Sequence, residues 1–386
     1  MSSPVDPALI FEDASPGPGT HAIVIGIGHY DAVAAESIAA AGLEQLAAPP
    51  LSARALVTWF LDHFDNPGRP LKSVSLVLSE GETARPFSHA RTIPGARPTI
   101  GAVSDVVPAI RAWLKRASSH SDNLAIFFFS GHGVSTGEPI LLLRDYGIDP
   151  ENRFDGAINF NRFAAAMKTK LPTHQVFFID ACQNPDPLAF SPDAAHREVG
   201  LACIEATTYG PVNAQQSVHH STSDLTVAYA RTSGLSLFTD ALIQGLNGGG
   251  AQSGTEWYVS TLGLQSVLSH QIERLARKLN IVQVPHAARC YQIPIHKPAA
   301  INVPLYVRCD PTAAMKNACI EILGVVPRNY YDSDEHEPTE EWMTVLSRGE
   351  YKVRATFKDH LGYREDESVS MVVPPEAICR IKCRPR

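Results

Sequence analysis

The sequence has no apolar run long enough to cross a membrane. Its longest apolar runs, such as LAIFFF at residues 124–129, fall far short of the roughly 18 residues that a membrane-spanning helix needs. The first residues, MSSPVDPALIFEDASPGPGTH, carry neither the basic start nor the apolar stretch of a secretory signal peptide. We therefore expect a cytoplasmic protein without a membrane span.

Positive charge and closely spaced cysteines are also scarce. The chain has 33 Lys and Arg against 40 Asp and Glu, a net charge of −7, and no cluster of basic residues that would bind a phosphate backbone. This composition argues against a nucleic-acid-binding protein. The seven cysteines are odd in number and widely spaced, which indicates reduced thiols rather than a disulfide framework.

Four of the cysteines, Cys309, Cys319, Cys379 and Cys383, fall in the last quarter of the chain. Only Cys379 and Cys383 come close to the spacing of a zinc site, so scattered thiols are favoured over a metal centre. We predict no metal and no cofactor.

What the chain does contain is a regular alternation of apolar strands and amphipathic helices. Strands are predicted at residues 21–30, 71–80, 123–133, 174–182 and 224–232, and helices at 50–64, 99–118, 158–169, 235–246 and 259–279. Strands that are apolar on both faces and alternate with helices indicate an α/β fold, with a mostly parallel sheet flanked by helices.

The composition changes near residues 296–304. After this point the chain consists of short β-rich segments separated by turns, which is typical of a small antiparallel β-sandwich. We therefore divide the chain into a flexible N-terminal segment (1–20), an α/β domain (21–297) and a C-terminal β-sandwich domain (298–386). Within the α/β domain, residues 183–223 show no period and are predicted to form a long loop.

Two short motifs, SGHG at residues 130–133 and DAC at 180–182, each stand at the end of a predicted strand. In parallel sheets, sites lie at the carboxyl ends of strands, so His132 and Cys182 are expected side by side. A cysteine peptidase needs a thiol, a base and amide donors for the oxyanion. The backbone N–H groups of Gly133 and Cys182 are the candidate donors, because Gly133 has no Cβ to obstruct a substrate carbonyl. The alternative is a buried structural thiol and a structural histidine.

A third motif, GIGHY at residues 26–30, ends the first predicted strand. It lacks the third glycine and the lysine of a phosphate-binding loop. We interpret it as a strand-to-loop turn. Similarly, His219 and His220 lie in the predicted long loop and are expected on the surface.

The order of the motifs resembles the caspase-like cysteine peptidases of clan CD. The resemblance rests on SGHG, a helix, DAC and then GLSLFTDALIQGL at residues 234–246. His132 precedes Cys182 by about 50 residues, as the catalytic histidine does in caspases. The resemblance covers roughly residues 20–295 and is nearer to bacterial caspase-like proteins, metacaspases and paracaspases than to animal caspases. It implies a caspase-like fold.

The resemblance also implies a covalent mechanism. Cys182 would attack the scissile carbonyl, His132 would protonate the leaving amine, and the amides of Gly133 and Cys182 would hold the oxyanion. The resemblance requires no third catalytic side chain.

A substrate preference follows from the same resemblance. In basic-specific relatives, the acid two residues before the nucleophile lines the S1 pocket, and Asp180 matches it. Ser52 stands where a second pocket acid usually lies, Asp31 is a candidate substitute, and Tyr229 is a further S1 candidate. We therefore predict cleavage after Arg or Lys, with a helix-capping role for Asp180 as the alternative.

The resulting hypothesis is a cysteine endopeptidase acting on specific protein substrates, in bacterial regulated proteolysis or defence. The 183–223 segment would gate the site by ordering or by autocleavage. The β-sandwich would bind an activating or regulatory protein. The alternative is a caspase-like pseudoprotease that serves as a binding or scaffolding module.

Overall fold

The computed structural model describes residues 6, 8–34, 43–81, 85–185, 199–207, 214–222, 234–254, 256–337, 339–358 and 362–385. The chain forms two compact units. The first comprises Met1–Ile243 and Leu268–Lys297, and the second comprises Gln244–Val267 and Pro298–Arg386. Among the described residues, no helix combines the length and the apolar character needed to span a bilayer.

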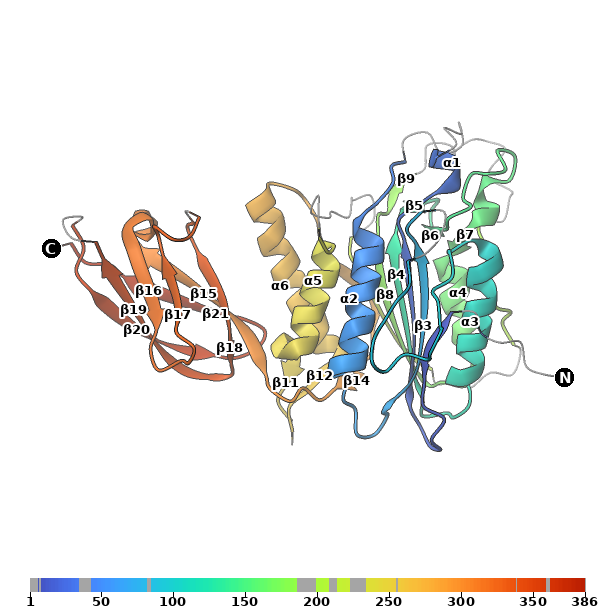
Figure 1. Cartoon of the computed structure of the whole chain (residues 1–386), viewed down its shortest axis with the longest axis horizontal. Helices are drawn as coiled ribbons and strands as arrows, with labels where there is room; N and C mark the ends of the chain where they lie inside the picture. The colour runs from blue at the N-terminus through green and yellow to red at the C-terminus, as the bar shows by residue number, and fades with distance from the viewer. Residues whose placement is uncertain are drawn as a thin grey trace. The chain divides into compact units, whose positions relative to one another are not determined.

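The first unit is built on a sheet whose seven described strands follow the order β1-β3-β2-β4-β8-β10-β13 (Figure 1). The five central strands are parallel to one another: β3 (Leu71–Ser79), β2 (Thr20–Ile27), β4 (Leu124–Gly131), β8 (His174–Ala181) and β10 (Gln215–His220). The edge strands β1 (Leu9–Glu12) and β13 (His286–Cys290) are antiparallel to their neighbours. The predicted α/β fold with a mostly parallel sheet is confirmed.

Helices cover both faces of this sheet, because its central strands are apolar on both sides. Helices α3 (Val103–Ala117) and α4 (Phe160–Met167) lie on one face, and α2 (Ala48–His63) and α5 (Leu237–Gln244) lie on the other (Figure 1). On the α2 face, a Cβ on Gly26 would come within 2.6 Å of the Pro49 carbonyl oxygen, so only glycine allows the helix to pack this closely.

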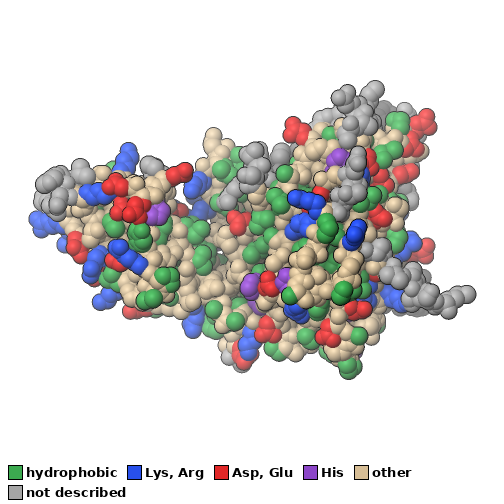
Figure 2. All heavy atoms as spheres, viewed as in Figure 1, with side chains coloured by type: hydrophobic (Ala, Val, Ile, Leu, Met, Phe, Trp, Pro, Cys, Tyr) green, Lys and Arg blue, Asp and Glu red, His purple; other side chains and the backbone are tan. Residues whose placement is uncertain are grey.

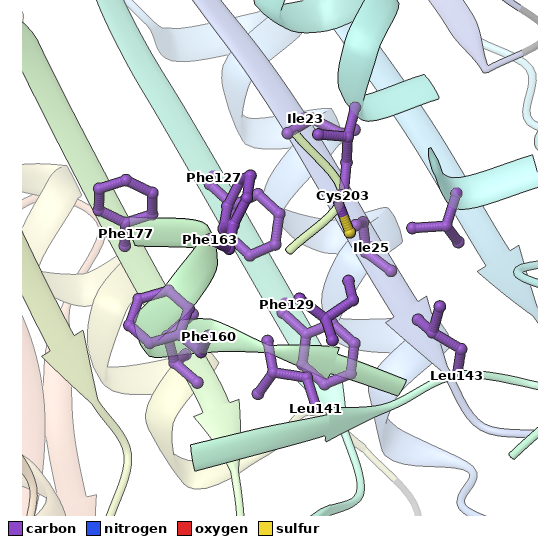
Figure 3. Close-up of a cluster of buried hydrophobic side chains, with 14 of the residues drawn as sticks. Ile23, Ile25, Phe127, Phe129, Leu141, Leu143, Phe160, Phe163, Phe177 and Cys203 are labelled. Atoms are coloured by element: carbon purple, nitrogen blue, oxygen red, sulfur yellow. The ribbon is translucent and has the colours of Figure 1, made fainter. Parts of the chain in front are cut away.

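The core beneath α3 and α4 is aromatic. Phe127 lies 5.0 Å from Phe163 between ring centroids (Figure 3). It lies 6.3 Å from Trp113, and all three side chains are fully buried. Burial of such large apolar side chains is the main source of stability for the sheet and holds its carboxyl edge rigidly.

The first unit also contains several smaller elements. They are α1 (Asp31–Ala34), β5 (Gly133–Ser135), β6 (Pro139–Leu142), η2 (Arg153–Gly156), β7 (Ala157–Asn159), β9 (Asn184–Pro185) and β14 (Pro294–His296). Strands β7, β6, β5 and β9 form a small second sheet. Helix α6 (Thr261–Leu279) has residues in both units.

The structure differs from the expectations in two segments of this unit. Residues 9–12, within the segment expected to be flexible, form the edge strand β1, which is too short to show a period in the sequence. Residues 215–220, within the expected structureless loop, form β10 in the sheet. The strand predicted at residues 224–232 lies outside the described part of the chain. In the structure, β10 is the strand that follows β8 in the sheet.

Strand β10 escaped prediction because its sequence, QQSVHH, is polar although five of its six residues are buried. The Gln216 amide donates to the Ala164 carbonyl at 2.8 Å and to the Gln175 side-chain oxygen at 2.9 Å. Such internal hydrogen bonds satisfy buried polar groups that an apolar pattern cannot reveal.

The second unit contains two sheets that share one apolar core. The strands are β15 (Asn302–Asp310), β16 (Ala318–Ile322), β17 (Asn329–Asp332), β18 (Trp342–Ser347), β19 (Gly349–Phe357), β20 (Asp366–Val372) and β21 (Ala377–Lys382), in the orders β18-β15-β21 and β17-β16-β19-β20. The unit also includes η3 (Gly245–Gly249), β11 (Ala251–Gln252), β12 (Tyr258–Ser260) and η4 (Thr312–Asn317). The expected arrangement was antiparallel throughout, but β15 and β21 pair in parallel.

Acidic and basic side chains are interspersed on the one face of the molecule that Figure 2 shows. On the face shown in Figure 2, blue and red atoms are mixed rather than separated into areas of one sign. This mixing accords with the modest net charge of the chain.

Candidate active site

The two motif residues leave adjacent strands at the same level. Strands β4 and β8 run in parallel, and the last pair in their register is Gly131 with Ala181. His132 and Cys182 are the next residues on each strand. Since neighbouring strands lie about 4.7–4.9 Å apart, the backbones of the two residues start from adjacent positions.

Gly133 packs directly against the turn that carries the cysteine. A Cβ at this position would lie 2.5 Å from the Cys182 carbonyl oxygen and 3.0 Å from the Ala181 Cβ. Only a residue without a side chain allows the two turns to come this close. The approach brings the Gly133 backbone to the residue whose own amide is the second predicted oxyanion donor.

The His132 ring is held by a backbone carbonyl. Its Nε2 lies 2.7 Å from the carbonyl oxygen of Glu44, and since a carbonyl only accepts, Nε2 must carry the proton. Nδ1 is then the basic nitrogen of the neutral ring. Burial lowers the pKa of His132, and the bond to the Glu44 carbonyl offsets part of this effect.

Tyr30 contacts both the backbone and the ring of His132. The His132 backbone N–H donates to the Tyr30 hydroxyl at 2.7 Å, and this hydroxyl donates to the Ile27 carbonyl at 3.2 Å. The two rings lie 5.0 Å apart between centroids. Tyr30 is fully buried, and burial raises the pKa of its hydroxyl, which therefore stays protonated.

Residues after β10 hold the turn that carries Cys182. The Ser221 and Thr222 hydroxyls both donate to the Ala181 carbonyl at 3.3 Å. The buried Gln183 amide donates to the Thr222 carbonyl at 3.0 Å and lies 3.2 Å from His220 Nδ1. Cys182 itself is a partly buried thiol.

The expectation that His219 and His220 are on the surface is wrong. Their side chains are buried, at 1% and 3% exposure. His219 stacks on Phe178, and His220 stacks on His286 with ring centroids 4.8 Å apart and an interplanar angle of 7°. Burial lowers the pKa of His220 to about 3, so this ring is neutral and serves packing.

Asp180 lies on the α2 and α5 side of the sheet, where hydroxyl groups surround it. Its Oδ2 accepts hydrogen bonds from Ser130 at 3.0 Å, from Thr239 at 3.2 Å and from Ser236. Burial raises the pKa of Asp180 even though these hydroxyls oppose the shift. Among the described residues, Asp180 forms no ion pair, so the carboxyl group is held by neutral donors.

The other predicted S1 residues are placed differently. The Ser52 hydroxyl accepts the Ser236 N–H at 3.1 Å and so belongs to the same hydrogen-bonded group as Asp180. Asp31 instead pairs with Arg144, at 2.9 Å from Nε and 2.8 Å from Nη2. Tyr229 lies outside the described residues.

Sequence reasoning missed several residues of this site. Ser130 lies within SGHG and Ser236 within GLSLFTDALIQGL, so the sequence contains both residues in motifs, although nothing in those motifs indicates that they contact Asp180. Tyr30 lies within GIGHY, and the strand-to-loop turn expected there gives no indication that Tyr30 contacts His132. The Glu44 carbonyl has no signature, because any residue supplies such an acceptor.

Comparison with known proteins connects this geometry to a family. A family model described as the caspase domain matches residues 97–301, more than half of the chain and including both His132 and Cys182. The uncharacterized protein y4kE of Sinorhizobium fredii (strain NBRC 101917 / NGR234) is 27% identical over 219 residues, which cover 55% of this chain. The match spans 60% of the length of y4kE.

Two solved structures are similar over most of their own lengths. Protein GSU0716 from Geobacter sulfurreducens matches 72% of this chain and 94% of its own, with 13% identity and a TM-score of 0.42. Caspase-1 from Spodoptera frugiperda matches 75% of this chain and 94% of its own, with 15% identity and a TM-score of 0.43.

Proposed function

The chain belongs to the caspase-domain family, and on this basis we propose that it is a cysteine endopeptidase in which Cys182 is the nucleophile and His132 transfers protons. The observation that carries the proposal is the parallel register that ends at Gly131 and Ala181. It delivers the histidine and the cysteine to one point on the sheet edge. The tie between His132 Nε2 and the Glu44 carbonyl leaves Nδ1 as the base.

The proposed reaction has two stages. The Cys182 thiol gives its proton to His132 Nδ1 and the sulfur attacks the scissile carbonyl carbon, forming a C–S bond. The Gly133 and Cys182 amides stabilise the oxyanion. Collapse breaks the C–N bond, and the leaving amine takes the proton from His132. Water, deprotonated by His132, then hydrolyses the thioester, and the proton returns to the released Cys182 sulfur.

We further propose that Asp180 gives the enzyme a preference for Arg or Lys at P1. A buried carboxyl group that has only neutral donors ionises at a cost, and a substrate guanidinium or ammonium would offset that cost through charge-assisted hydrogen bonds. The competing role is structural. The Ser236 hydroxyl contacts Asp180 and accepts the Thr239 N–H at 3.0 Å, so Asp180 would fix the start of α5.

A panel of fluorogenic peptides that differ only at P1 separates the two roles of Asp180. The substitution Asp180→Asn keeps the shape but removes the charge. We expect kcat/KM for Arg and Lys peptides to fall about 10- to 100-fold, as for loss of a hydrogen bond to a charged group. The matched control is Ser236→Ala, which keeps the charge and should retain the preference for basic residues. A preference of the wild type for Asp or for small residues at P1 would contradict the proposal.

For the second unit, we propose binding of an activating or regulatory protein. The support is a group of exposed apolar side chains on the two strands that flank β15, at Met343 and Val345 of β18 and Ile378 of β21. Soluble domains commonly use such patches for protein contacts. The double substitution Met343→Ser and Val345→Thr should abolish activation by cell extract without changing basal peptide cleavage. Activation that survives it would rule out this surface.

The biological setting that we propose is bacterial regulated proteolysis or defence. A cellular effect that persists unchanged in Cys182→Ala would instead favour the scaffold function.

A further inference from the structure

The segment that supplies the Glu44 carbonyl lies between the described end of α1 and the start of α2 and is exposed at Glu44 and Gln45. An exposed connection does not by itself hold a carbonyl oxygen 2.7 Å from a catalytic ring nitrogen. The question is therefore which contacts fix residues 44–46 against the sheet.

The Gln45 side chain makes two hydrogen bonds to one backbone residue. Its Oε1 accepts the Tyr30 N–H at 2.8 Å, and its Nε2 donates to the Tyr30 carbonyl at 3.0 Å. The amide thereby occupies both backbone groups of Tyr30, as a neighbouring strand would. Of the side chains that match its length, only glutamine offers a neutral acceptor and donor together.

A second contact brings the same two segments together. The Leu46 N–H donates to the Gly28 carbonyl at 2.8 Å. A Cβ on Gly28 would lie 2.1 Å from the Leu46 carbonyl oxygen, so the approach requires glycine at this position. The backbone of the GIGHY motif therefore supplies the hydrogen-bonding groups that bind residues 44–46.

These contacts form one network with His132. Tyr30, which Gln45 holds by its backbone, supports the His132 backbone through its hydroxyl. Glu44, which precedes Gln45, accepts from the His132 ring. The Gln45 side chain thus links Tyr30, which binds the His132 backbone, to the segment whose Glu44 carbonyl accepts from the His132 ring.

We propose that Gln45 is a positioning residue for His132, because its two-bond bridge to Tyr30 fixes the Glu44 carbonyl that holds the ring in the Nε2–H tautomer. Without the bridge, the carbonyl moves from the ring nitrogen, and the proton distributes between Nε2 and Nδ1. Molecules with the proton on Nδ1 have no basic nitrogen facing the thiol. This inference rests on the proposed function only for its consequence in catalysis.

The test is the tautomer of His132 in the full-length protein, measured by the ¹⁵N chemical shifts of its ring nitrogens. The His132→Ala spectrum identifies the signals. The variant Gln45→Met keeps the length of the side chain and removes both hydrogen bonds. Glu44→Gln is the matched control, because it changes the neighbouring side chain and leaves the backbone carbonyl in place.

We expect the wild type and Glu44→Gln to hold a single Nε2–H tautomer at neutral pH and Gln45→Met to populate both. Loss of the hydrogen-bond partner that orients a metal-bound histidine costs about 10- to 100-fold in activity, and we take the same range here. We therefore expect kcat to fall by this factor in Gln45→Met while KM stays unchanged. A single tautomer in Gln45→Met overturns the inference. A wild type that holds the tautomer but cleaves no peptide refutes the proposed function and leaves the positioning role supported.

Discussion

Replacing Tyr30 with phenylalanine removes the hydroxyl oxygen that accepts the backbone N–H of His132, the proposed base. The hydroxyl accepts the His132 N–H and donates to the Ile27 carbonyl, both within the buried end of the sheet. Phenylalanine keeps the ring, so packing against His132 at 5.0 Å is preserved. The His132 N–H and one lone pair of Ile27 then lose their partner.

The magnitude follows from the cost of an unsatisfied buried donor, about 1–3 kcal/mol. We expect the free energy of unfolding to fall by this amount in urea titrations. The comparison is Tyr351→Phe, because the Tyr351 hydroxyl donates to the Ser347 carbonyl at an exposed position and its loss should cost little.

The same substitution should also slow the reaction of Cys182. We expect the rate of alkylation by iodoacetamide at neutral pH to fall, because His132 is displaced from the thiol that we propose it activates. The reasoning is refuted if Tyr30→Phe unfolds and alkylates as the wild type does. A loss of stability with an unchanged alkylation rate would refute the link between Tyr30 and the base.

Three further predictions follow from other parts of the first unit. Gly133→Ala places a Cβ 2.5 Å from the Cys182 carbonyl oxygen, so we expect kcat/KM to fall about 100-fold, measured with the preferred peptide; retained activity would contradict the close approach of the two turns. Burial lowers the pKa of His21 to about 4 from 6.5. The unfolded chain therefore binds this proton first as the pH falls below 6.5, and His21 alone lowers the stability by about 1.4 kcal/mol per pH unit down to about pH 4. In urea titrations between pH 7 and 5, His21→Gln should flatten this fall, and an equal slope would contradict it. Finally, the His132 pKa is lowered, so the acid limb of the kcat/KM profile should lie below pH 6.5; a limb above 7 would count against His132 as the base.

The parts of the fold that sequence predicted best are those where burial is uniform. Strands β2, β4 and β8 are fully or almost fully buried along their length and appear as continuous apolar runs. The apolar runs of β4 and β8 give way directly to SGHG and DAC, so the sequence predicts that His132 and Cys182 lie at the edge of the sheet. Strand β10 lies beside β8 in the same sheet but satisfies its buried polar groups by hydrogen bonds, so its polar sequence predicts a loop.

The site was predictable only where a side chain carries the chemistry. Asp180 was identified, but its surroundings of Ser130, Ser236 and Thr239 come from three separate segments and follow from no local pattern. The acceptor of the His132 ring is the Glu44 backbone carbonyl, and the residue that we propose to position it is Gln45, in a connecting segment. Neither has a residue signature, so tertiary structure was needed to find them.

The central claim is that Cys182 is the nucleophile activated by His132. The most direct measurement is the site of covalent modification by a peptidyl-arginine chloromethyl ketone, located by peptide mass spectrometry. We predict one adduct per chain, on Cys182, absent in Cys182→Ala and formed more slowly in His132→Ala. Cys290 is an exposed free thiol and serves as the internal reference for unselective alkylation. Modification of Cys290 at the same rate as Cys182, or an adduct that forms equally fast without His132, would contradict the account.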